Sequence, residues 1–257
     1  MCCDLVRVSS EPPPYDAIAD AYDLLTAGHA HDAWLARIET LALAQGLTGR
    51  RVLDVACGTG KSFAPLLQRG YVVIACDASP AMVARARVRA GGRAEVLVAD
   101  MRTLPALGSF DLVTCLDDAL CHLLTAQDML AALQGIRRNL APGGLLVFDV
   151  ALPAAYAGAA DAIAGDDRRV VLWRAPAGDG IEAEIVVEVF TERPDGLYER
   201  ARMVQRHRRY GVAEIRDLAA RAGLRVRAVV GQEAGGVLCA GLDEARHRKA
   251  MFVLSRR

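Results

Sequence analysis

The chain has 257 residues, of which 53% are hydrophobic and 24% charged, and its 31 basic and 31 acidic side chains give a formal net charge of zero. This much apolar material excludes a globally disordered chain, and the length fits one elaborated domain or two small ones. A protein that neutralises many phosphates usually carries a basic excess. The zero net charge therefore disfavours nucleic-acid binding as the main task.

The cysteines and the N-terminal residues indicate the compartment. The number of cysteines, seven, is odd, no Cys-x-x-Cys pair occurs, and no His/Cys cluster has zinc-finger spacing. Residues 1–4 lack the basic stretch and apolar run of a signal peptide, and the most apolar segment, 143–165, is interrupted by Asp149, Pro153 and Asp161. We therefore expect a cytoplasmic protein with reduced thiols, no membrane contact and no metal site.

The first 47 residues predict an extended lead-in followed by two short helices. Three consecutive prolines end the lead-in, residues 1–14, and their rings oppose helix formation. From Tyr15 to Leu47 apolar residues recur at helical spacing, and Gly28 interrupts the pattern. We expect a helix on each side of a break around residues 27–31.

The next hundred residues alternate short apolar runs with helical stretches. Strands are expected at 51–56, 71–76, 94–99, 110–116 and 145–150, and helices near 61–69, 80–90 and 126–140. Continuous apolar runs bounded by glycine, proline or aspartate are typical of strands buried on both faces. Their alternation with helices predicts right-handed crossovers and a parallel, doubly wound α/β sheet.

A period of two from Arg168 to Tyr210 predicts a small antiparallel β insert. Its three strands are expected at 170–173, 181–191 and 197–209, followed by a helix at 212–222 and strands at 224–230 and 250–254. Arginines share one face of the third strand, and glutamates share a face of the second: Arg200, Arg202, Arg206 and Arg208 against Glu182, Glu184 and Glu188. This pattern favours cross-strand ion pairs on a solvated face over a nucleic-acid surface.

A strand that runs into the glycine turn Gly58-Thr59-Gly60 predicts a nucleotide site. Glycines at these positions let backbone amides approach a ligand at a helix N-terminus. A dinucleotide fingerprint would need a third glycine where Phe63 stands, and a phosphate-binding P-loop would need one where Val55 stands. Both alternatives are therefore disfavoured.

The third alternative is an S-adenosylmethionine site, which predicts acids at the ends of neighbouring strands. Asp77 ends the second strand, where an acid would hold the ribose diol, and Asp100 follows the third, near the adenine amine. Asp54, inside the first strand, would orient the glycine loop or receive the methionine ammonium through water. An unpaired carboxylate there would be costly. Three acids at adjacent strand ends predict a single crevice.

The chain resembles the class I S-adenosylmethionine-dependent methyltransferases in LDVACGTG (53–60), the Asp77 strand end, the Asp100 step and FDLVTCL (110–116), within residues 15–150. YDAIADAYD (15–23), DAWLARIE (32–39), FDLVTCLDDALCHLL (110–124) and the late insert are similar to a subgroup that includes natural-product sugar N-methyltransferases and glycine/sarcosine-type N-methyltransferases. The resemblance implies a Rossmann-like sheet of seven strands with the last antiparallel, and a β insert after the fifth strand. It implies S-adenosylmethionine as cofactor and S-adenosylhomocysteine as product.

The resemblance also implies which residues contact the cofactor, from the glycine loop, the strand ends and an N-terminal lid. They are Tyr15, Tyr22, Trp34, Asp54, Ala56, Gly58, Thr59, Gly60, Asp77, Ala78, Met82, Asp100, Met101, Arg102 and Leu116. Aromatic faces near a sulfonium cation are physically reasonable. For Tyr22 and Trp34, however, simple amphipathic packing is the alternative.

The catalytic candidates are His122, Asp117 and Asp118, just past the fourth strand. His122 falls where members of the subgroup carry a histidine, and it would remove or relay a proton; a satisfied structural histidine is the alternative. The Asp117-Asp118 pair departs from the subgroup, and would hold a sulfonium or an amine cation, or form a strand-end turn. The substrate-binding candidates are Tyr15, Asp118, His207, Arg209 and Tyr210.

The resemblance implies methyl transfer to a nitrogen of a small-molecule acceptor in natural-product metabolism. Transfer to a hydroxyl or carboxyl oxygen and a non-catalytic, cofactor-binding regulator are the alternatives. We divide the chain into an N-terminal segment with lid helices (1–47), a cofactor-binding core (48–165), the β insert (166–211) and the C-terminal part of the core (212–257). The insert is expected to cover the acceptor or to pair two subunits in a homodimer.

Overall fold

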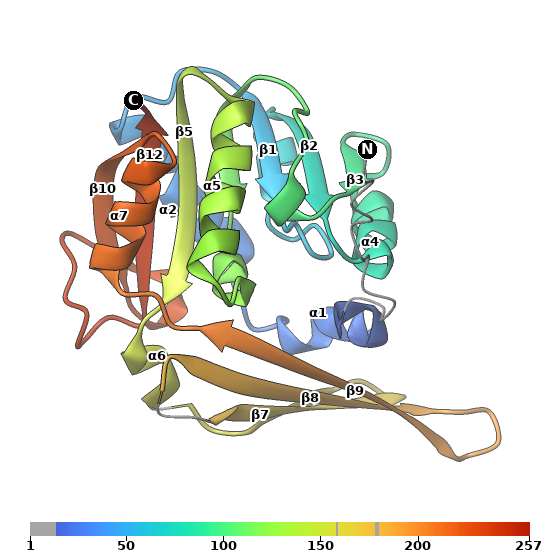
Figure 1. Ribbon diagram of the computed structural model, residues 1–257. Helices are drawn as coiled ribbons and strands as arrows, with labels where there is room; N and C mark the ends of the chain where they lie inside the picture. The colour runs from blue at the N-terminus through green and yellow to red at the C-terminus, as the bar shows by residue number, and fades with distance from the viewer. Residues whose placement is uncertain (1–13, 158, 178–179) are drawn as a thin grey trace, which may run out of the picture.

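The computed structural model describes residues 14–157, 159–177 and 180–257. Its larger sheet has eight strands in the order β11-β10-β12-β5-β4-β1-β2-β3 (Figure 1). The bounds are β1 (Arg51–Val55), β2 (Val72–Asp77), β3 (Glu95–Val98), β4 (Phe110–Cys115), β5 (Leu140–Ala151), β10 (Leu224–Gln232), β11 (Leu238–Cys239) and β12 (Lys249–Arg256). The extended lead-in expected for residues 1–14 lies, apart from Pro14, outside the described residues.

The strand directions confirm the predicted Rossmann-like fold. β1 to β5 pair in parallel, whereas β12, the last strand, runs antiparallel to both β5 and β10. The two-residue strand β11 at the edge is an addition to the seven expected strands. At the centre of the sheet Phe148 of β5 stacks on Phe252 of β12, with ring centroids 5.0 Å apart.

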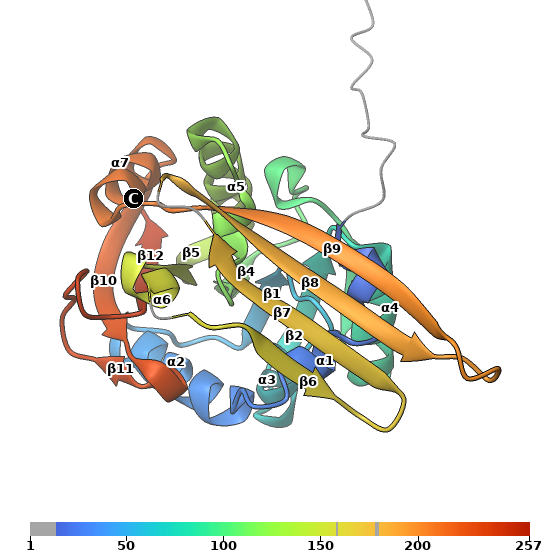
Figure 2. The same cartoon turned by 90° about the horizontal axis from the view of Figure 1, so that it is seen from below.

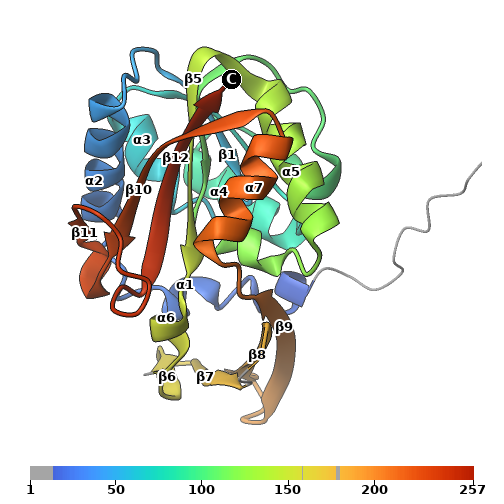
Figure 3. The ribbon, with the colours of Figure 1, turned by 60° about the vertical axis from the view of Figure 1, so that its left-hand side comes forward.

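Helices cover both faces of this sheet (Figure 3). α2 (His31–Ala44), α3 (Ala64–Gln68) and α4 (Pro80–Ala90) share one apolar cluster, while α5 (Ala126–Asn139) and α7 (Val212–Arg221) share the other. Hydroxyl side chains cap the N-termini of two helices, as is typical of serine and threonine at this position. Ser79 caps α4 by accepting the Met82 N–H, and Thr125 caps α5 by accepting the Asp128 N–H. No helix among the described residues is long and apolar enough to cross a membrane.

The predicted β insert forms a second, antiparallel sheet, but it has four strands rather than three. They are β6 (Ala162–Gly165), β7 (Arg169–Ala177), β8 (Glu182–Glu192) and β9 (Tyr198–Arg208), in sequence order. β6 starts four residues before the proposed boundary at 166 and follows the short helix α6 (Pro153–Ala157). Its sequence AIAG has a single β-branched residue, so the strand carries little propensity signal of its own.

The second sheet lies across the C-terminal ends of the parallel strands, with the N-terminal segment between the two sheets (Figures 1 and 2). That segment contains the 3-10 helix η1 (Pro14–Ile18) and α1 (Tyr22–Leu25). Ile18 packs against Val187 and Met203 of the second sheet in a separate apolar cluster. The other short 3-10 helices are η2 (Met101–Thr103), η3 (Ala119–His122) and η4 (Ala234–Gly236).

Two of the four predicted arginines on β9 form the predicted ion pairs with β8. Arg200 pairs with Glu188, and Arg206 pairs with Glu182, both across β8 and β9. Glu188 is only 5% exposed and also binds Arg174 of β7, so this face is partly buried rather than fully solvated. Arg208 departs from the pattern, because it pairs with Glu214 of α7.

Candidate functional site

A cavity of about 530 Å³ lies where the parallel strands end beneath the second sheet. Its size is within the range of small-molecule sites. Fourteen of the twenty-one predicted site residues line its wall, together with residues that were not predicted. The fourteen are Tyr15, Tyr22, Ala56, Gly58, Thr59, Asp77, Ala78, Met82, Asp100, Met101, Arg102, Leu116, Asp117 and His122. The topology therefore brings the glycine loop, three strand ends and the N-terminal segment to one space.

The glycine loop has the backbone conformation that its sequence predicts. Gly58 and Gly60 have positive φ angles of 53° and 86°, which favour glycine. A Cβ on Gly60 would lie 2.6 Å from the ring of Phe63, so a side chain has no room there. Gly58 lines the cavity and has no heavy atom within 4 Å of a Cβ position, which leaves its backbone open to a ligand.

Asp77 joins the glycine loop to the end of β2. Its two carboxylate oxygens accept the backbone N–H groups of Gly58 at 2.8 Å and Ser79 at 2.9 Å. Burial raises the pKa of this carboxyl, and the backbone hydrogen bonds oppose the rise. The side chain therefore fixes the loop from inside the cavity wall.

Asp54 is a support of the loop rather than part of the cavity wall. Its two oxygens accept the hydroxyls of Ser62 and Thr114, so the carboxylate is paired within the core. Burial raises its pKa to about 6. Of the two roles expected for Asp54, the geometry favours orienting the loop. Gly60 is likewise absent from the wall.

Asp100 and Arg102 form the third strand-end feature. The carboxylate of Asp100 accepts the Arg102 backbone N–H at 2.8 Å and its Nε at 2.9 Å. These contacts with the guanidinium lower the pKa of Asp100 despite its partial burial. The pair lies beside Met101 on the wall, as the resemblance implied.

Tyr15 and His122 lie in contact with each other on the cavity wall. The Tyr15 hydroxyl lies 3.1 Å from Nε2 of His122. His207 of β9 packs edge-on against the His122 ring, with centroids 4.4 Å apart. Burial and the neighbouring His207 lower the pKa of His122 to about 3, so its imidazole is neutral at neutral pH.

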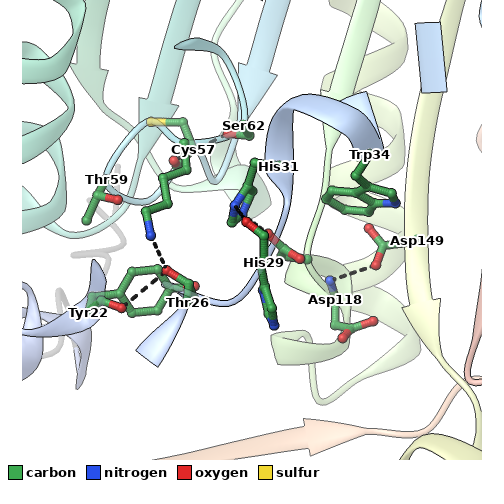
Figure 4. Close-up of polar contacts among 12 residues, drawn as sticks. Tyr22, Thr26, His29, His31, Trp34, Cys57, Thr59, Ser62, Asp118 and Asp149 are labelled. Atoms are coloured by element: carbon green, nitrogen blue, oxygen red, sulfur yellow. Dashed lines mark hydrogen bonds and ion pairs between the residues drawn. The ribbon is translucent and has the colours of Figure 1, made fainter. Parts of the chain in front are cut away.

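Four charged side chains cluster beside the end of β4. Lys249 of β12 lies 2.8 Å from Asp149, 3.0 Å from Asp118 and 3.7 Å from Asp117. Figure 4 shows the Asp149 carboxylate next to Trp34 and facing the backbone of Asp118, whose N–H donates to Asp149 at 3.2 Å. Only Asp117 of these residues reaches the cavity.

Five further predicted residues do not line the cavity, which corrects the expectation of direct contact. Trp34 donates its indole N–H to Gln232 at 2.8 Å, so the packing alternative describes it better. Tyr210 donates its hydroxyl to main-chain carbonyls after η3, and Arg209 lies over the Tyr156 ring. Asp118 pairs with Lys249, and His207 packs against His122, so neither side chain is part of the wall.

The sequence did not point to several residues on the wall. They are Pro14, His31, Cys57, Lys61, Ser62, Ala99, Ala119, Leu123, Leu124, Asp128, Val204, Gln205 and Arg206. The last three belong to β9, so the second sheet covers the cavity; its predicted role in a homodimer stays a prediction. Gln205 has a buried amide oxygen that makes no hydrogen bond within the described part of the chain. Period-two patterning located this strand without showing which residue would face the cavity.

Comparison with known proteins agrees with this geometry. Residues 52–144 match the methyltransferase domain family. The chain is 32% identical to the cypemycin N-terminal methyltransferase of a Streptomyces species, covering 96% of this chain and 99% of the relative. A solved S-adenosylmethionine-bound amino pentose methyltransferase from Micromonospora echinaspora, involved in calicheamicin biosynthesis, has 26% identity and a TM-score of 0.72, with 93% of this chain and 95% of that one covered. A sugar N-methyltransferase from Streptoalloteichus shares the fold, with 23% identity, a TM-score of 0.78 and 100% and 99% coverage.

Proposed function

The chain belongs to the class I S-adenosylmethionine-dependent methyltransferases, and from this premise we propose that it methylates an amine nitrogen of a small acceptor in natural-product metabolism. Its cofactor is S-adenosylmethionine, which supplies a methyl group on a sulfonium leaving group. The open glycine turn and the carboxylates at the strand ends fit this cofactor. Asp77 would hold the ribose hydroxyls, and Asp100 the adenine amine.

The observation that carries the choice of nitrogen is the charge cluster beside the end of β4, from which Asp117 reaches the cavity wall. Three carboxylates, Asp117, Asp118 and Asp149, surround the single ammonium of Lys249. Contacts with His31 and Lys249 lower the pKa of Asp117 despite burial, so the residue that reaches the cavity is anionic. An excess of negative charge attracts a protonated amine as well as a sulfonium, whereas a neutral hydroxyl gains little from it.

An amine attacks the methyl group only after it has lost its proton. The neutral pair of Tyr15 and His122 suits this deprotonated amine. A neutral imidazole can accept a hydrogen bond from the amine and steer its lone pair, although its low pKa makes it a weak proton store. The unpaired oxygen of Gln205 offers a second acceptor for an N–H of the substrate. The names of the relatives, an N-terminal methyltransferase and sugar or amino pentose methyltransferases, support an amine acceptor.

Enclosure of the cavity by β9 supplies a further contribution to catalysis. Gln205 and Arg206 cover the cavity opposite the strand ends. A covered site holds acceptor and cofactor in fixed orientation, and alignment alone can lower a barrier by roughly 7–11 kcal/mol. The residues of this chain therefore mainly orient the acceptor, exclude water and accept a hydrogen bond from an N–H of the acceptor.

Replacing His122 by alanine should lower the rate of methyl transfer about 100-fold, because the hydrogen bond that would orient the attacking amine is lost. S-adenosylhomocysteine affinity, measured by calorimetry, should stay within about threefold, since His122 is expected to contact the acceptor. Tyr15→Phe should show a smaller loss, and Tyr198→Phe, an exposed tyrosine on β9, serves as its control. A loss of less than about tenfold in His122→Ala would exclude a role in proton transfer.

The nitrogen assignment is tested with matched acceptors and labelled S-adenosylmethionine. Amino sugars and short peptides with a free terminal amine are compared with their hydroxyl and N-acetyl twins. We expect label only on the amines, with mass spectrometry placing the methyl group on nitrogen. Equal labelling of the hydroxyl twins would support oxygen transfer instead, and tight S-adenosylhomocysteine binding without any transfer would support a non-catalytic regulator.

A further inference from the structure

Two histidines and one aspartate converge beside the cavity, and His31 and Asp117 of these line it. His29 and His31 lie in the segment that leads into α2, and Asp117 directly follows β4 and Leu116. One ligand atom from each residue lies within 4.8 Å of the other two. Figure 4 shows both histidines beside each other on the same bend, ahead of Trp34. This group could not be predicted from the sequence, because Asp117 is 86 residues away from His31.

The hydrogen bonds of His31 determine which of its nitrogens is available to a ligand. Its Nδ1 lies 3.0 Å from the main-chain carbonyl oxygen of His29, and since a carbonyl can only accept, Nδ1 carries the proton. Nε2 is then left to face the carboxylate of Asp117 at 3.4 Å. A histidine that donates one ring N–H to a backbone carbonyl and presents the other nitrogen has the arrangement common to metal ligands.

The contact between Nε2 of His31 and the carboxylate of Asp117 needs a positive charge between the two groups. In a neutral His31 the Nε2 lone pair would point at the lone pairs of an ionised carboxylate, which is repulsive. A second proton on the imidazole would remove the repulsion, and so would a metal ion bound by both groups. His29 adds a third donor atom to the group, and it is exposed, so an ion from solvent can reach it.

The surrounding charges favour a divalent ion over a single proton. Asp118 and Asp149 stand behind Asp117, and Lys249 is the one ammonium among these three carboxylates. Two imidazoles and one carboxylate are a donor set for zinc and similar transition metals, whereas magnesium and calcium prefer oxygen ligands alone.

We propose that His29, His31 and Asp117 bind a divalent transition-metal ion such as Zn²⁺, and that this ion competes with S-adenosylmethionine. His31 and Asp117 also line the cofactor cavity. Both the metal and the sulfonium end of the cofactor are cations that draw on the carboxylate of Asp117. The site would therefore act as an inhibitory metal site, independent of which acceptor the enzyme methylates.

A second group, Glu233, Cys239 and His247, provides the internal comparison. Nδ1 of His247 accepts the Asp243 backbone N–H at 2.9 Å, so in the neutral ring the proton sits on Nε2. That nitrogen has no lone pair for a metal. In addition, Glu233 is already paired with Arg246. We therefore expect Cys239→Ser to leave metal binding at the first group unchanged.

The first test is calorimetric titration of the full chain, free of cofactor, with Zn²⁺. We expect one saturable ion per chain and a loss of affinity in His29→Ala and in His31→Ala of at least the roughly 10–100-fold that even outer-shell changes cause. With Co²⁺ as a spectroscopic probe, no sulfur-to-metal charge-transfer band should appear. Retained binding in both histidine variants, or its loss in Cys239→Ser, would overturn the proposal.

The second test measures competition. Saturating Zn²⁺ should raise the apparent dissociation constant of S-adenosylmethionine at least about tenfold in the wild-type chain and not in His29→Ala. His29 is the sharper variant, because it does not line the cavity and its loss should leave cofactor affinity unchanged without the metal. Absence of any saturable Zn²⁺ binding would mean that a proton alone bridges His31 and Asp117. Both tests read out binding, so they fail or succeed separately from the proposed amine transfer.

Discussion

Replacing Asp77 by alanine should weaken S-adenosylhomocysteine binding about 100-fold or more. A hydrogen bond to a charged group contributes roughly 1.5–3 kcal/mol, so the loss of contacts to two ribose hydroxyls amounts to at least about 3 kcal/mol. The same change removes the acceptor of the Gly58 N–H and loosens the glycine loop. Calorimetric titration with S-adenosylhomocysteine measures this effect without any acceptor.

Two variants separate ribose binding from support of the loop. Asp77→Asn keeps one oxygen acceptor and should fall between the wild type and the alanine variant. Asp111→Ala is the matched control, because its carboxylate also accepts a strand backbone N–H, that of Arg51 at 2.9 Å, but outside the cavity. Wild-type affinity in Asp77→Ala would show that the ribose is held elsewhere.

Replacing Lys249 by methionine should destabilise the fold by about 2–4 kcal/mol. Removing one partner of a buried ion pair typically costs roughly 3–5 kcal/mol, and we reduce that range because the Lys249 side chain is 18% exposed. Asp149, whose side chain is fully buried, would lose its ammonium partner and keep one oxygen without any described hydrogen bond. Thermal unfolding should then shift down on the order of 10 °C.

The deficit of Lys249→Met should grow with pH. Burial raises the pKa of Asp149 and the Lys249 ammonium opposes that rise, so without Lys249 the folded pKa of Asp149 lies higher still. The buried acid is protonated at low pH in both proteins, and the extra cost of ionising it in the variant increases as pH rises through the folded pKa. Nearby carboxylates raise the pKa of Lys249, whose contribution is complete below the unfolded lysine value of about 10.4 and constant in this range. Melting curves at pH 5 and pH 8 should therefore show the smaller deficit at pH 5.

A double-mutant cycle checks that the carboxylate causes the loss. Lys249→Met combined with Asp149→Asn removes the ammonium together with its most buried acid, and should recover a large part of the stability. Arg246→Met, which removes an exposed cation paired with Glu233, should cost well under about 1 kcal/mol. If the double variant is as unstable as the single one, the charge cluster does not explain the effect.

The parallel half of the fold was predictable because its signals are local. Each buried strand from β1 to β5 is a continuous apolar run, and the crossover rules then place their ends at one edge. Asp77 and Asp100 could be assigned to the cavity because they stand where strands end. The turn at Gly58 and Gly60 was also predictable, because glycine readily adopts the positive φ angles found there.

The remaining features depend on contacts between distant segments. Lys249 was not singled out, although it is one of only two lysines, because its three acids become neighbours only when β12 pairs with β5. Trp34 has helical spacing whether it faces the cavity or the core, and packing against Gln232 decides. Likewise, the alternation of side chains along β9 does not reveal which face of the sheet points toward the cavity, so it could not show that Gln205 lines the cavity.

If cofactor and acceptor share the cavity beneath β9, Gln205→Trp should block the acceptor and spare the cofactor. A bulky side chain at this position should fill the acceptor half, so methyl transfer should fall by about 100-fold while S-adenosylhomocysteine affinity stays within about threefold. Arg202→Trp, exposed on the opposite face of the same strand, should leave both unchanged. Unaltered transfer by Gln205→Trp with a functional amine acceptor would contradict the account, because the acceptor would then reach the methyl group by another route.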